Sequence, residues 1–410
     1  MTPDISSNRL FARLLALMLL LATPAVSCAR EQPSNLMFLD GKDSFTVPFE
    51  LVDNRIFVGV WLEGRGPFKF ILDTGGNAAL SVETAKKIGA KLGNEIRGSG
   101  AGESVVTAWE TSVAETRIGG LALKGQDYNV FDFSDMRHVF GAQTFDGVIG
   151  LPVFSQAVVR VDYERKLLTF TKPSGFEYRG AGTSVPLELS GFIPVVRGEV
   201  DGIGARFGLD TGDRSALTLK SPFVAEYKLR EKYAPKVEAV TGWGIGGPIR
   251  AQVVRVGVLK FGGVEVRETV TRLSLQKAGA FAAGDVAGNV GDAILKQFTA
   301  TFDYSRHLLY LEKNSSYGRR DAYDRAGLWL SRSADGRSFD VFDVVANGPA
   351  AEAGLKVGDR VVAFDGKSVE ALQLIAAREE LKDARRKSVR LTVRDGERTR
   401  DVVVTLRDLI

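Results

Sequence analysis

The sequence predicts a mainly β protein made of two matching lobes, followed by a smaller α+β domain. Three observations lead to this fold class. The segment FILDTGGNAAL at residues 70–80 returns as FGLDTGDRSAL at residues 207–217, 137 residues later (210 − 73). Apolar and polar residues alternate with a period of two around both copies, which is typical of strands. A polar linker then separates this repeated region from a C-terminal segment with its own pattern of strands and helices.

Length and composition are those of a soluble protein with several domains. The 410 residues are 44% hydrophobic and 25% charged, and the 45 glycines suit a chain with many tight turns. The net charge of +4 is spread along the chain, without a basic stripe between aromatic residues, so no nucleic-acid partner is expected. With two histidines and one cysteine, we expect no metal, no cofactor and no histidine-assisted nucleophile.

Residues 1–28 read as a signal peptide. Arg9 and Arg13 precede an apolar run at 14–22, and small residues follow at 23–27. Nine apolar residues are too few to span a bilayer as a helix, although an N-terminal anchor is the alternative. We therefore expect a periplasmic or otherwise extracytoplasmic protein. Cys28, in the segment AVSC, would carry a lipid tether if that segment acts as a lipobox; ordinary signal-peptide cleavage is the other expectation.

Two predicted lobes, at residues 37–175 and 180–314, carry the repeat. In each, a hairpin of alternating residues leads into an apolar strand and then into the Asp-Thr-Gly turn. An offset of 141 aligns Gly150 with Gly291 further along, and a Gly-Gly turn occurs in each lobe, at 119–120 and 262–263. The helix candidates are SVETAKKIGA at 81–90 and LKSPFVAEYKL at 219–229. Two units of one design are expected to associate about a local twofold axis.

The paired Asp-Thr-Gly turns suggest a chemistry. A carboxylate on a tight turn after a buried strand is held rigidly, and the glycine brings N–H groups close to it. A twofold axis between the turns would place Asp73 and Asp210 face to face. A water between them would have a general base on one side, while the other carboxylic acid could donate to a carbonyl oxygen. The supporting turn residues would be Thr74, Gly75, Thr211 and Gly212.

The region from about residue 47 to 313 resembles a bacterial two-lobed aspartic protease of the pepsin/retropepsin type. The resemblance rests on both Asp-Thr-Gly turns, on the hydrophobic-hydrophobic-Gly element at 148–150 and, less closely, on its counterpart at 289–291. It implies duplicated β-barrel lobes around a pseudo-twofold axis and a catalytic Asp73/Asp210 pair that shares one proton. It also implies a polypeptide substrate and, because one chain carries both aspartates, a monomer.

Glycine-rich hairpins cover the cleft in that family, and the candidates here are residues 98–103 and 242–247; surface loops are the alternative. Family members usually have Ser, Thr or Ala after Asp-Thr-Gly, where this chain has Gly76 and Asp213. Gly76 removes a hydrogen-bond donor, and Asp213 would place a third carboxylate near the pair, neutralised by Arg214 as an adjacent surface pair. These departures keep a second hypothesis open, in which an inactive scaffold with the protease fold binds peptides or partners.

After a linker at 315–325, residues 326–410 resemble a PDZ domain of the bacterial protease-associated kind. The matching segment is GPAAEAGLKVGDRVVAFDGKSV at 348–369. The resemblance implies a loop that binds the C-terminal carboxylate of a peptide ligand and a strand that pairs with it. That loop would be Gly327, Leu328, Trp329 and Leu330; alternatively, the strand packs on the protease lobes and binds no peptide. Together these features predict an exported aspartic endopeptidase whose PDZ domain helps to recognise polypeptide.

Overall fold

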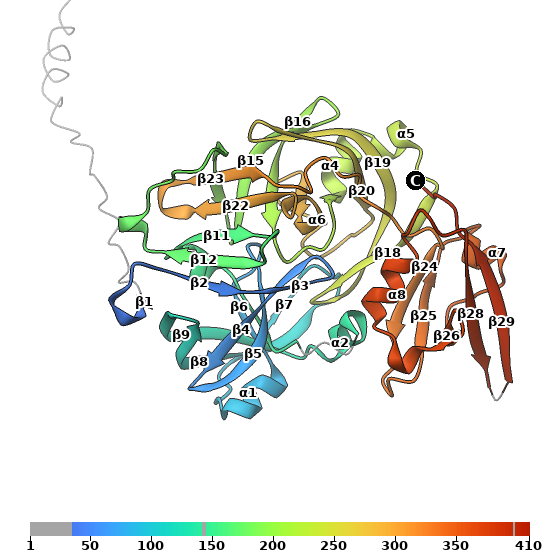
Figure 1. Ribbon diagram of the computed structural model, residues 1–410, viewed down its shortest axis with the longest axis horizontal. Helices are drawn as coiled ribbons and strands as arrows, with labels where there is room; N and C mark the ends of the chain where they lie inside the picture. Colours follow the sequence, from blue (N-terminus) through green and yellow to red (C-terminus); the bar gives the residue numbers. More distant parts are fainter. Residues whose placement is uncertain (1–34, 142–144, 397) are drawn as a thin grey trace, which may run out of the picture. The chain divides into compact units, whose positions relative to one another are not determined.

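The computed structural model describes residues 35–141, 145–396 and 398–410 (Figure 1). The predicted signal peptide and Cys28 lie outside these residues, so both remain predictions. Strands dominate the described residues and form four sheets there, which confirms the mainly β fold class. No helix in the described part of the chain is long and apolar enough to cross a membrane. Within the same residues, no group of three or more His, Cys, Asp or Glu side chains could hold a metal ion.

The first-lobe sheet contains nine strands within the described residues. They are β1 (Leu36–Phe38), β3 (Glu50–Val52), β4 (Arg55–Leu62), β5 (Arg65–Leu72), β6 (Ala78–Ser81), β7 (Glu95–Gly98), β8 (Val106–Ile118), β9 (Leu121–Phe131) and β10 (Gly147–Ile149). At its centre, β10 pairs in parallel with β5 and antiparallel with β6. The short strand β10 thus lies between β5 and β6. Its hydrogen bonds to both strands fix the position of the Asp-Thr-Gly turn that connects them.

The second-lobe sheet contains eight strands in the described residues. They are β14 (Glu188–Ser190), β15 (Ile193–Val200), β16 (Ile203–Asp210), β17 (Leu217–Leu219), β18 (Val237–Gly244), β19 (Gly247–Phe261), β20 (Val264–Ser274) and β21 (Gly288–Gly291). Each pairing in this sheet has a counterpart of the same direction in the first lobe; for example, β21 lies parallel to β16 and antiparallel to β17. The second Asp-Thr-Gly turn is consequently held in the same way as the first.

A third sheet, the shared sheet, joins the two lobes. It contains β2 (Ser44–Pro48), β11 (Val158–Asp162), β12 (Leu167–Thr171), β13 (Thr183–Pro186), β22 (Phe298–Asp303) and β23 (Leu308–Lys313). Strand β11 of the first lobe pairs with β22 of the second, with Val159 opposite Phe302. The lobes share a core as well, since the Phe154 ring lies 5.4 Å from that of Phe302.

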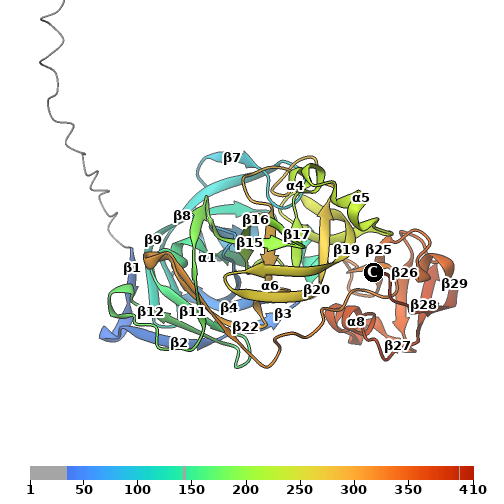
Figure 2. The same ribbon diagram turned by 90° about the horizontal axis from the view of Figure 1, so that it is seen from above.

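The C-terminal sheet belongs to the PDZ region. It contains β24 (Leu328–Arg332), β25 (Phe339–Val344), β26 (Arg360–Phe364), β27 (Lys367–Ser368), β28 (Ser388–Asp395) and β29 (Arg398–Thr405). Its own core, which includes Phe339, Leu374 and Leu391, is separate from that of the lobes. Strand β24 is an edge strand, and the helix α8 (Leu374–Glu380) lies beside it. Figure 2 shows this region next to the second-lobe strands β19 and β20.

The helices are short. They are α1 (Val82–Ile88), α2 (Ser134–Phe140), α3 (Leu151–Phe154), α4 (Ser221–Glu226), α5 (Leu229–Tyr233), α6 (Asp292–Leu295), α7 (Pro349–Glu352) and α8. The helix expected at 81–90 is α1: Ser81 Oγ accepts the Thr84 N–H at its start, and Gly89, with φ of 76°, ends it. The helix candidate at 219–229 is split into α4 and α5 by Lys228, whose φ is 49°.

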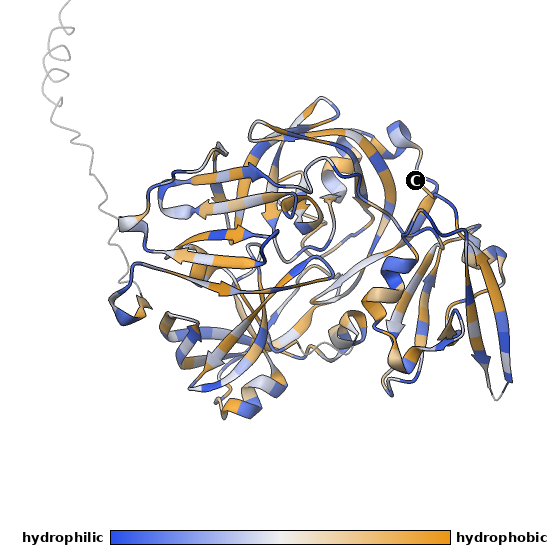
Figure 3. Cartoon of the chain, viewed as in Figure 1, coloured by the Kyte–Doolittle hydropathy of each residue, from blue (hydrophilic) through white to orange (hydrophobic). Residues whose placement is uncertain are grey.

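Hydrophobic and hydrophilic residues alternate along many strands (Figure 3), as expected when one face of a sheet is buried.

Candidate active site

The two Asp-Thr-Gly turns are tied together by their threonines. Thr74 N donates to Thr211 Oγ1 at 3.0 Å, and Thr211 N donates to Thr74 Oγ1 at the same distance. Each hydroxyl in turn donates to a carbonyl oxygen of the other lobe, that of Leu209 or Leu72, at 2.7 Å. The equal distances reflect a local twofold axis between the turns. All four bonds are buried, so they hold the turns in a fixed relation.

Asp73 and Asp210 face each other across this axis, close enough for their carboxyl groups to interact directly. Gly75 N donates to Asp73 Oδ1 at 2.8 Å, and Gly212 N donates to Asp210 Oδ1 at 2.9 Å. Each glycine also lies against the carboxyl of the other lobe. A Cβ atom at Gly212 would lie 2.4 Å from Asp73 Cγ, and one at Gly75 would lie 2.9 Å from Asp210 Cγ. Only glycine leaves room for both carboxyls at these positions.

The pair is arranged to hold a proton. Burial raises the pKa of Asp73. The pKa of Asp210 lies well above its usual range because of burial, and then because of the negative charges of Asp73 and Asp213. Two carboxyls in contact cannot both ionise readily, so they titrate as a unit with one proton between them. A pair in this state can act as acid and base in the same reaction.

Asp210 receives more hydrogen bonds than Asp73 does. Asn289 Nδ2 donates to Asp210 Oδ2 at 2.8 Å, and Asp213 N donates to Asp210 Oδ1 at 3.0 Å. Asn289 looked from the sequence like a small departure from the hydrophobic-hydrophobic-Gly pattern. In the structure it contacts the candidate catalytic carboxyl directly. On the other side, Gly76 lies close to Asp73, where a Cβ atom would be 3.0 Å from Asp73 Oδ2.

The third carboxylate, Asp213, is neutralised from within the second lobe. Its Oδ1 accepts from Ser215 Oγ at 2.7 Å and lies 3.3 Å from Arg272 Nη1. Burial alone would raise the pKa of Asp213, but Arg272 and the Ser215 hydrogen bonds lower it. The expectation that Arg214 neutralises Asp213 as a surface pair is therefore wrong. The Asp213 and Arg272 side chains are only 9% and 8% exposed, and Arg214 turns to a different partner.

That partner is Asp53, in the turn between β3 and β4. Arg214 Nη2 donates to Asp53 Oδ1 at 2.5 Å, and Arg55 Nη1 donates to Asp53 Oδ2 at 3.1 Å. Arg55 also donates from Nε to the carbonyl oxygen of Gly212, at 2.9 Å. The first lobe thus contacts the catalytic turn of the second through a buried ion cluster. The positive charge of Arg55 also lowers the pKa of Asp73, in opposition to the burial that raises it.

A cavity of about 610 Å³ opens above the two aspartates. Its walls are largely apolar and come from both lobes, with Phe131, Phe133, Phe145, Trp243, Ile249 and Phe281 among the lining residues. Both glycine-rich segments named from the sequence border it. They also contact each other: Gly102 N donates to the Ile245 carbonyl oxygen at 2.8 Å, and Ser104 N donates to that of Gly246 at 3.0 Å. The two hairpins therefore form one roof over the cavity.

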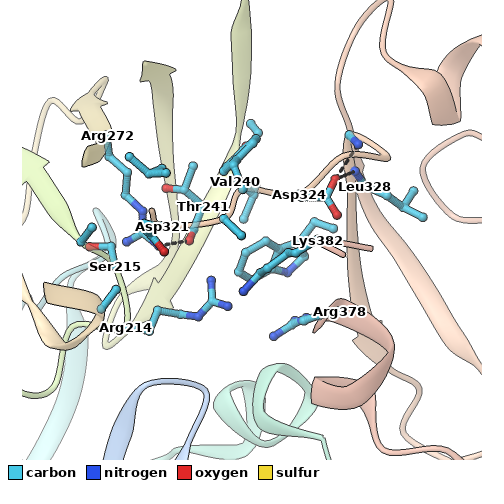
Figure 4. A pocket seen from close by; sticks show the side chains of 18 of the residues that line it. Arg214, Ser215, Val240, Thr241, Arg272, Asp321, Asp324, Leu328, Arg378 and Lys382 are labelled. Carbon is cyan, nitrogen blue, oxygen red and sulfur yellow. Dashed lines mark hydrogen bonds between the residues drawn. The ribbon is translucent and has the colours of Figure 1, made fainter. Parts of the chain in front are cut away.

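The predicted PDZ loop lies at the start of β24. Its N–H groups are partly used within the chain, because Asp324 Oδ1 accepts from the N–H groups of Ala326, Gly327 and Leu328 at 3.1, 2.5 and 3.0 Å. Trp329 lies between two guanidinium groups, with Arg378 4.5 Å and Arg214 5.6 Å from its ring centroid. The loop therefore meets the second lobe at a pocket that Arg214, Arg378 and Lys382 line (Figure 4).

The free edge of β24, which a peptide would extend, contacts the first lobe. His138 Nδ1, in α2, lies 3.2 Å from the Arg332 carbonyl oxygen. Within the PDZ region, Arg378 Nη2 of α8 donates to the Leu330 carbonyl oxygen at 2.5 Å, so a second acceptor of this strand is also in use. A Cβ atom at Gly141, directly after α2, would lie 3.2 Å from Leu374 Cβ in α8. These contacts favour the alternative in which the strand packs on the protease lobes. The peptide-binding role of Gly327, Leu328, Trp329 and Leu330 remains a prediction.

Comparisons with known proteins agree with this architecture in two separate regions. Residues 58–153 match the aspartyl protease family. This match contains Asp73 and the glycine of the first hydrophobic-hydrophobic-Gly element. Residues 341–395 match the PDZ domain family, and this match begins after the predicted carboxylate-binding loop. Among solved structures, the aspartic proteinase from Irpex lacteus is 15% identical, and the match covers 68% of this chain and 99% of that one, with a TM-score of 0.42. No curated protein sequence matches.

The sequence identified both aspartates of the dyad but missed the side chains that surround them. Asn289, Arg272 and Arg55 all contact the dyad or its turns, and none was singled out as a functional residue. The repeat does not mark them, because each differs in type from the residue at the equivalent position of the other lobe.

Proposed function

We propose that this chain is an aspartic endopeptidase in which Asp73 and Asp210 activate a water molecule. The observation that carries the proposal is the contact of two carboxyls from matching turns at the base of an apolar cavity of about 610 Å³. The buried threonine bonds hold the turns, so the carboxyl pair is preorganised. The two glycine-rich hairpins cover the cavity, and an extended polypeptide would lie between them and the dyad.

The expected reaction needs no covalent intermediate. The ionised carboxyl of the pair takes a proton from water, whose oxygen then attacks the peptide carbonyl carbon. The protonated carboxyl donates its proton to the carbonyl oxygen, so the pair has exchanged one proton for another. Collapse of the tetrahedral species returns a proton to the leaving amine. The phenylalanine-rich walls suit apolar side chains next to the bond that is cut.

The test is digestion of casein between pH 3 and 8 by the wild-type chain and by Asp73→Asn and Asp210→Asn. Each substitution removes one member of the pair, so we expect cleavage to fall by at least about a hundredfold. A hydroxyl-containing transition-state mimic such as pepstatin provides a second probe. Full activity in either variant would exclude the dyad mechanism. A wild-type chain that binds peptides without cutting them at any pH would support the inactive scaffold instead.

We further propose that the chain is exported and works outside the cytoplasm. The support is the order of basic, apolar and small residues in the first 28 positions. Mass spectrometry of the protein from a bacterial host should find a mature chain that begins at or after Cys28. Fatty-acid labelling that disappears in Cys28→Ala would identify a lipid tether, whereas an unlabelled mature chain would indicate ordinary cleavage. A chain that keeps its first residues would contradict export by a cleaved signal.

A further inference from the structure

The two lobes differ in charge at the turn that precedes the strand hairpin of each, between β3 and β4 in the first lobe and between β14 and β15 in the second. Strand register makes the comparison direct, since Val52 pairs with Arg55 around one turn and Ser190 pairs with Ile193 around its counterpart. Arg55 therefore corresponds to Ile193, a residue that cannot donate a hydrogen bond. The matching turn residue for Asp53 is Gly191. The first lobe thus carries an ion pair where the second has none.

In the Asp-Thr-Gly turns, it is the second lobe that carries the additional charged residues. At an offset of 137 residues, Asp213 and Arg214 in the second lobe correspond to Gly76 and Asn77 in the first. The added charges of the second lobe meet the added charges of the first, because Arg214 binds Asp53. Residues that break the internal symmetry have therefore collected in one buried network. Stability alone does not explain a buried ion network of this kind, because replacing buried ions by apolar residues is often neutral or stabilising.

The network continues into the PDZ region through Arg378 of α8. Asp53, whose side chain is 2% exposed, lies 3.1 Å from Arg55, 2.5 Å from Arg214 and 3.9 Å from Arg378. Burial alone would raise the pKa of Asp53, but the three guanidinium groups hold it well below its usual range. The path from the PDZ region to the catalytic turn therefore has three steps: Arg378 to Asp53, Asp53 to Arg55, and Arg55 to the Gly212 carbonyl oxygen.

Arg378 is itself firmly held. Its side chain is 7% exposed. Its Nη1 donates to the Val139 carbonyl oxygen in α2 at 3.0 Å, and its Nη2 donates to that of Leu330 in β24. Its guanidinium lies over the Trp329 ring. It thus connects the first lobe, the edge of the PDZ sheet and the ion cluster, and Figure 4 shows it in the pocket that Arg214 also lines.

We propose that Arg378 is a positioning residue for the second catalytic turn: through Asp53 and Arg55 it holds the Gly212 carbonyl, and with it Asp210, in the geometry that the dyad requires. The docked PDZ region is then a structural part of the active site rather than an appended recognition module. The effect on catalysis rests on the proposed protease function. The effect on the catalytic turn does not, because it follows from the contacts alone.

The experiment compares Arg378→Ala and Arg378→Lys with Arg332→Ala in the full chain. Arg332 is a matched control, since it too lies over an aromatic ring, Phe339, and donates to backbone carbonyls, those of Gly336 and Val369, but all these partners belong to the PDZ region. Two quantities are measured: the amide hydrogen exchange of residues 207–216, and kcat and KM on an unfolded protein substrate.

In Arg378→Ala, we expect exchange in residues 207–216 to accelerate and kcat to fall by roughly ten- to a hundredfold, with KM nearly unchanged. Arg378→Lys retains the charge and should recover part of both losses, whereas Arg332→Ala should match the wild type. Unchanged exchange and kcat in a folded Arg378→Ala chain would overturn the proposal, as would equal losses in Arg332→Ala. If Arg378→Ala does not fold, Asp53→Asn interrupts the same path and must show the faster exchange. Because exchange needs no turnover, an inactive wild type would overturn the protease function without deciding this inference.

Discussion

Asn289 gives Asp210 a hydrogen-bond donor at a place where the first lobe has Val148. The two residues occupy equivalent positions, one residue before Val290 and Ile149, in strands that pair in the same way. The symmetry of the dyad therefore includes its backbone and the paired threonines, but it does not extend to the side chains that contact the outer carboxyl oxygens. A donor to a carboxylate favours the charged form and lowers its pKa. Asn289 thus opposes the burial that raises the pKa of Asp210.

Replacement of Asn289 by Leu should move the acidic limb of the activity profile to higher pH. The substitution removes the hydrogen bond to the charged form, so the pair will keep its second proton up to a higher pH. The expected shift is roughly one pH unit, read from kcat/KM between pH 2 and 7. Asn94→Leu is the control, because Asn94 is exposed and contacts Glu110 far from the dyad. An acidic limb at the same pH in Asn289→Leu and wild type would contradict this role.

Among single residues, the sequence predicted the side chains that the two lobes share and missed those in which the lobes differ. Asp73 and Asp210 were found because the same turn occurs twice. Arg272 and Arg55 reach their partners only through strand register and the twofold axis, which bring together residues 59 and 157 positions apart in the chain. A repeat search has no signal for such pairs. The structure also corrected the partner of Asp213, since charge order along the chain does not show which guanidinium folds back onto it.

The two glycine-rich hairpins act as one element although they come from different lobes. Both were predicted as candidate covers, and the structure places both at the cavity and in mutual contact. Their glycines are needed for that contact, since a Cβ atom at Gly102 would lie 2.1 Å from the Gly246 carbonyl carbon. The contact itself could not be predicted, because it joins two turns that no local pattern relates. Substrate entry requires that the hairpins separate.

Gly102→Ala should weaken the roof without disturbing either lobe. The added methyl group forces the hairpins apart, so we expect KM for a long peptide to rise several-fold, as remote contacts to the substrate are lost. Gly204→Ala is the control: Gly204 is exposed, and a Cβ atom there would meet nothing within 4 Å. Both variants should unfold at similar temperatures. Identical KM values for Gly102→Ala and wild type would show that the roof contact has no part in substrate binding.

For the whole molecule, the main surprise is how extensively the PDZ region contacts the second lobe. Asp343 in β25 accepts from Val240 N at 2.6 Å and pairs with Arg250 at 2.7 Å, so it holds both strands of the second hairpin. The Phe342 and Trp243 rings meet edge to face at 5.0 Å. A small apolar cluster centred on Val345 extends this contact to β18, β19 and β20. The sequence predicted a module after a polar linker and offered packing of one of its strands on the lobes as an alternative, but it gave no sign of the contacts that Asp343, Phe342 and Val345 make.

The apolar cluster around Val345 joins the PDZ region to the second lobe, so we expect the lobes and the PDZ region to unfold together. Calorimetry of the wild type should show one transition, whereas Val345→Asp should show two, because a carboxylate buried in this apolar cluster costs several kcal/mol and would release the PDZ region. Val403→Asp is the control, since Val403 is 56% exposed on β29. Two transitions in the wild type would mean that the regions are thermally independent.

The shared sheet has a consequence for how the chain is made. Strand β11 offers one edge to β22, and the paired residues Val159 and Phe302 are 143 positions apart (302 − 159). A ribosome that has released the first lobe must still synthesise most of the second before that edge is covered. During this interval the nascent polypeptide presents an open strand of apolar residues, which invites association with other chains. That edge therefore stays open until β22, which ends at Asp303, has been synthesised.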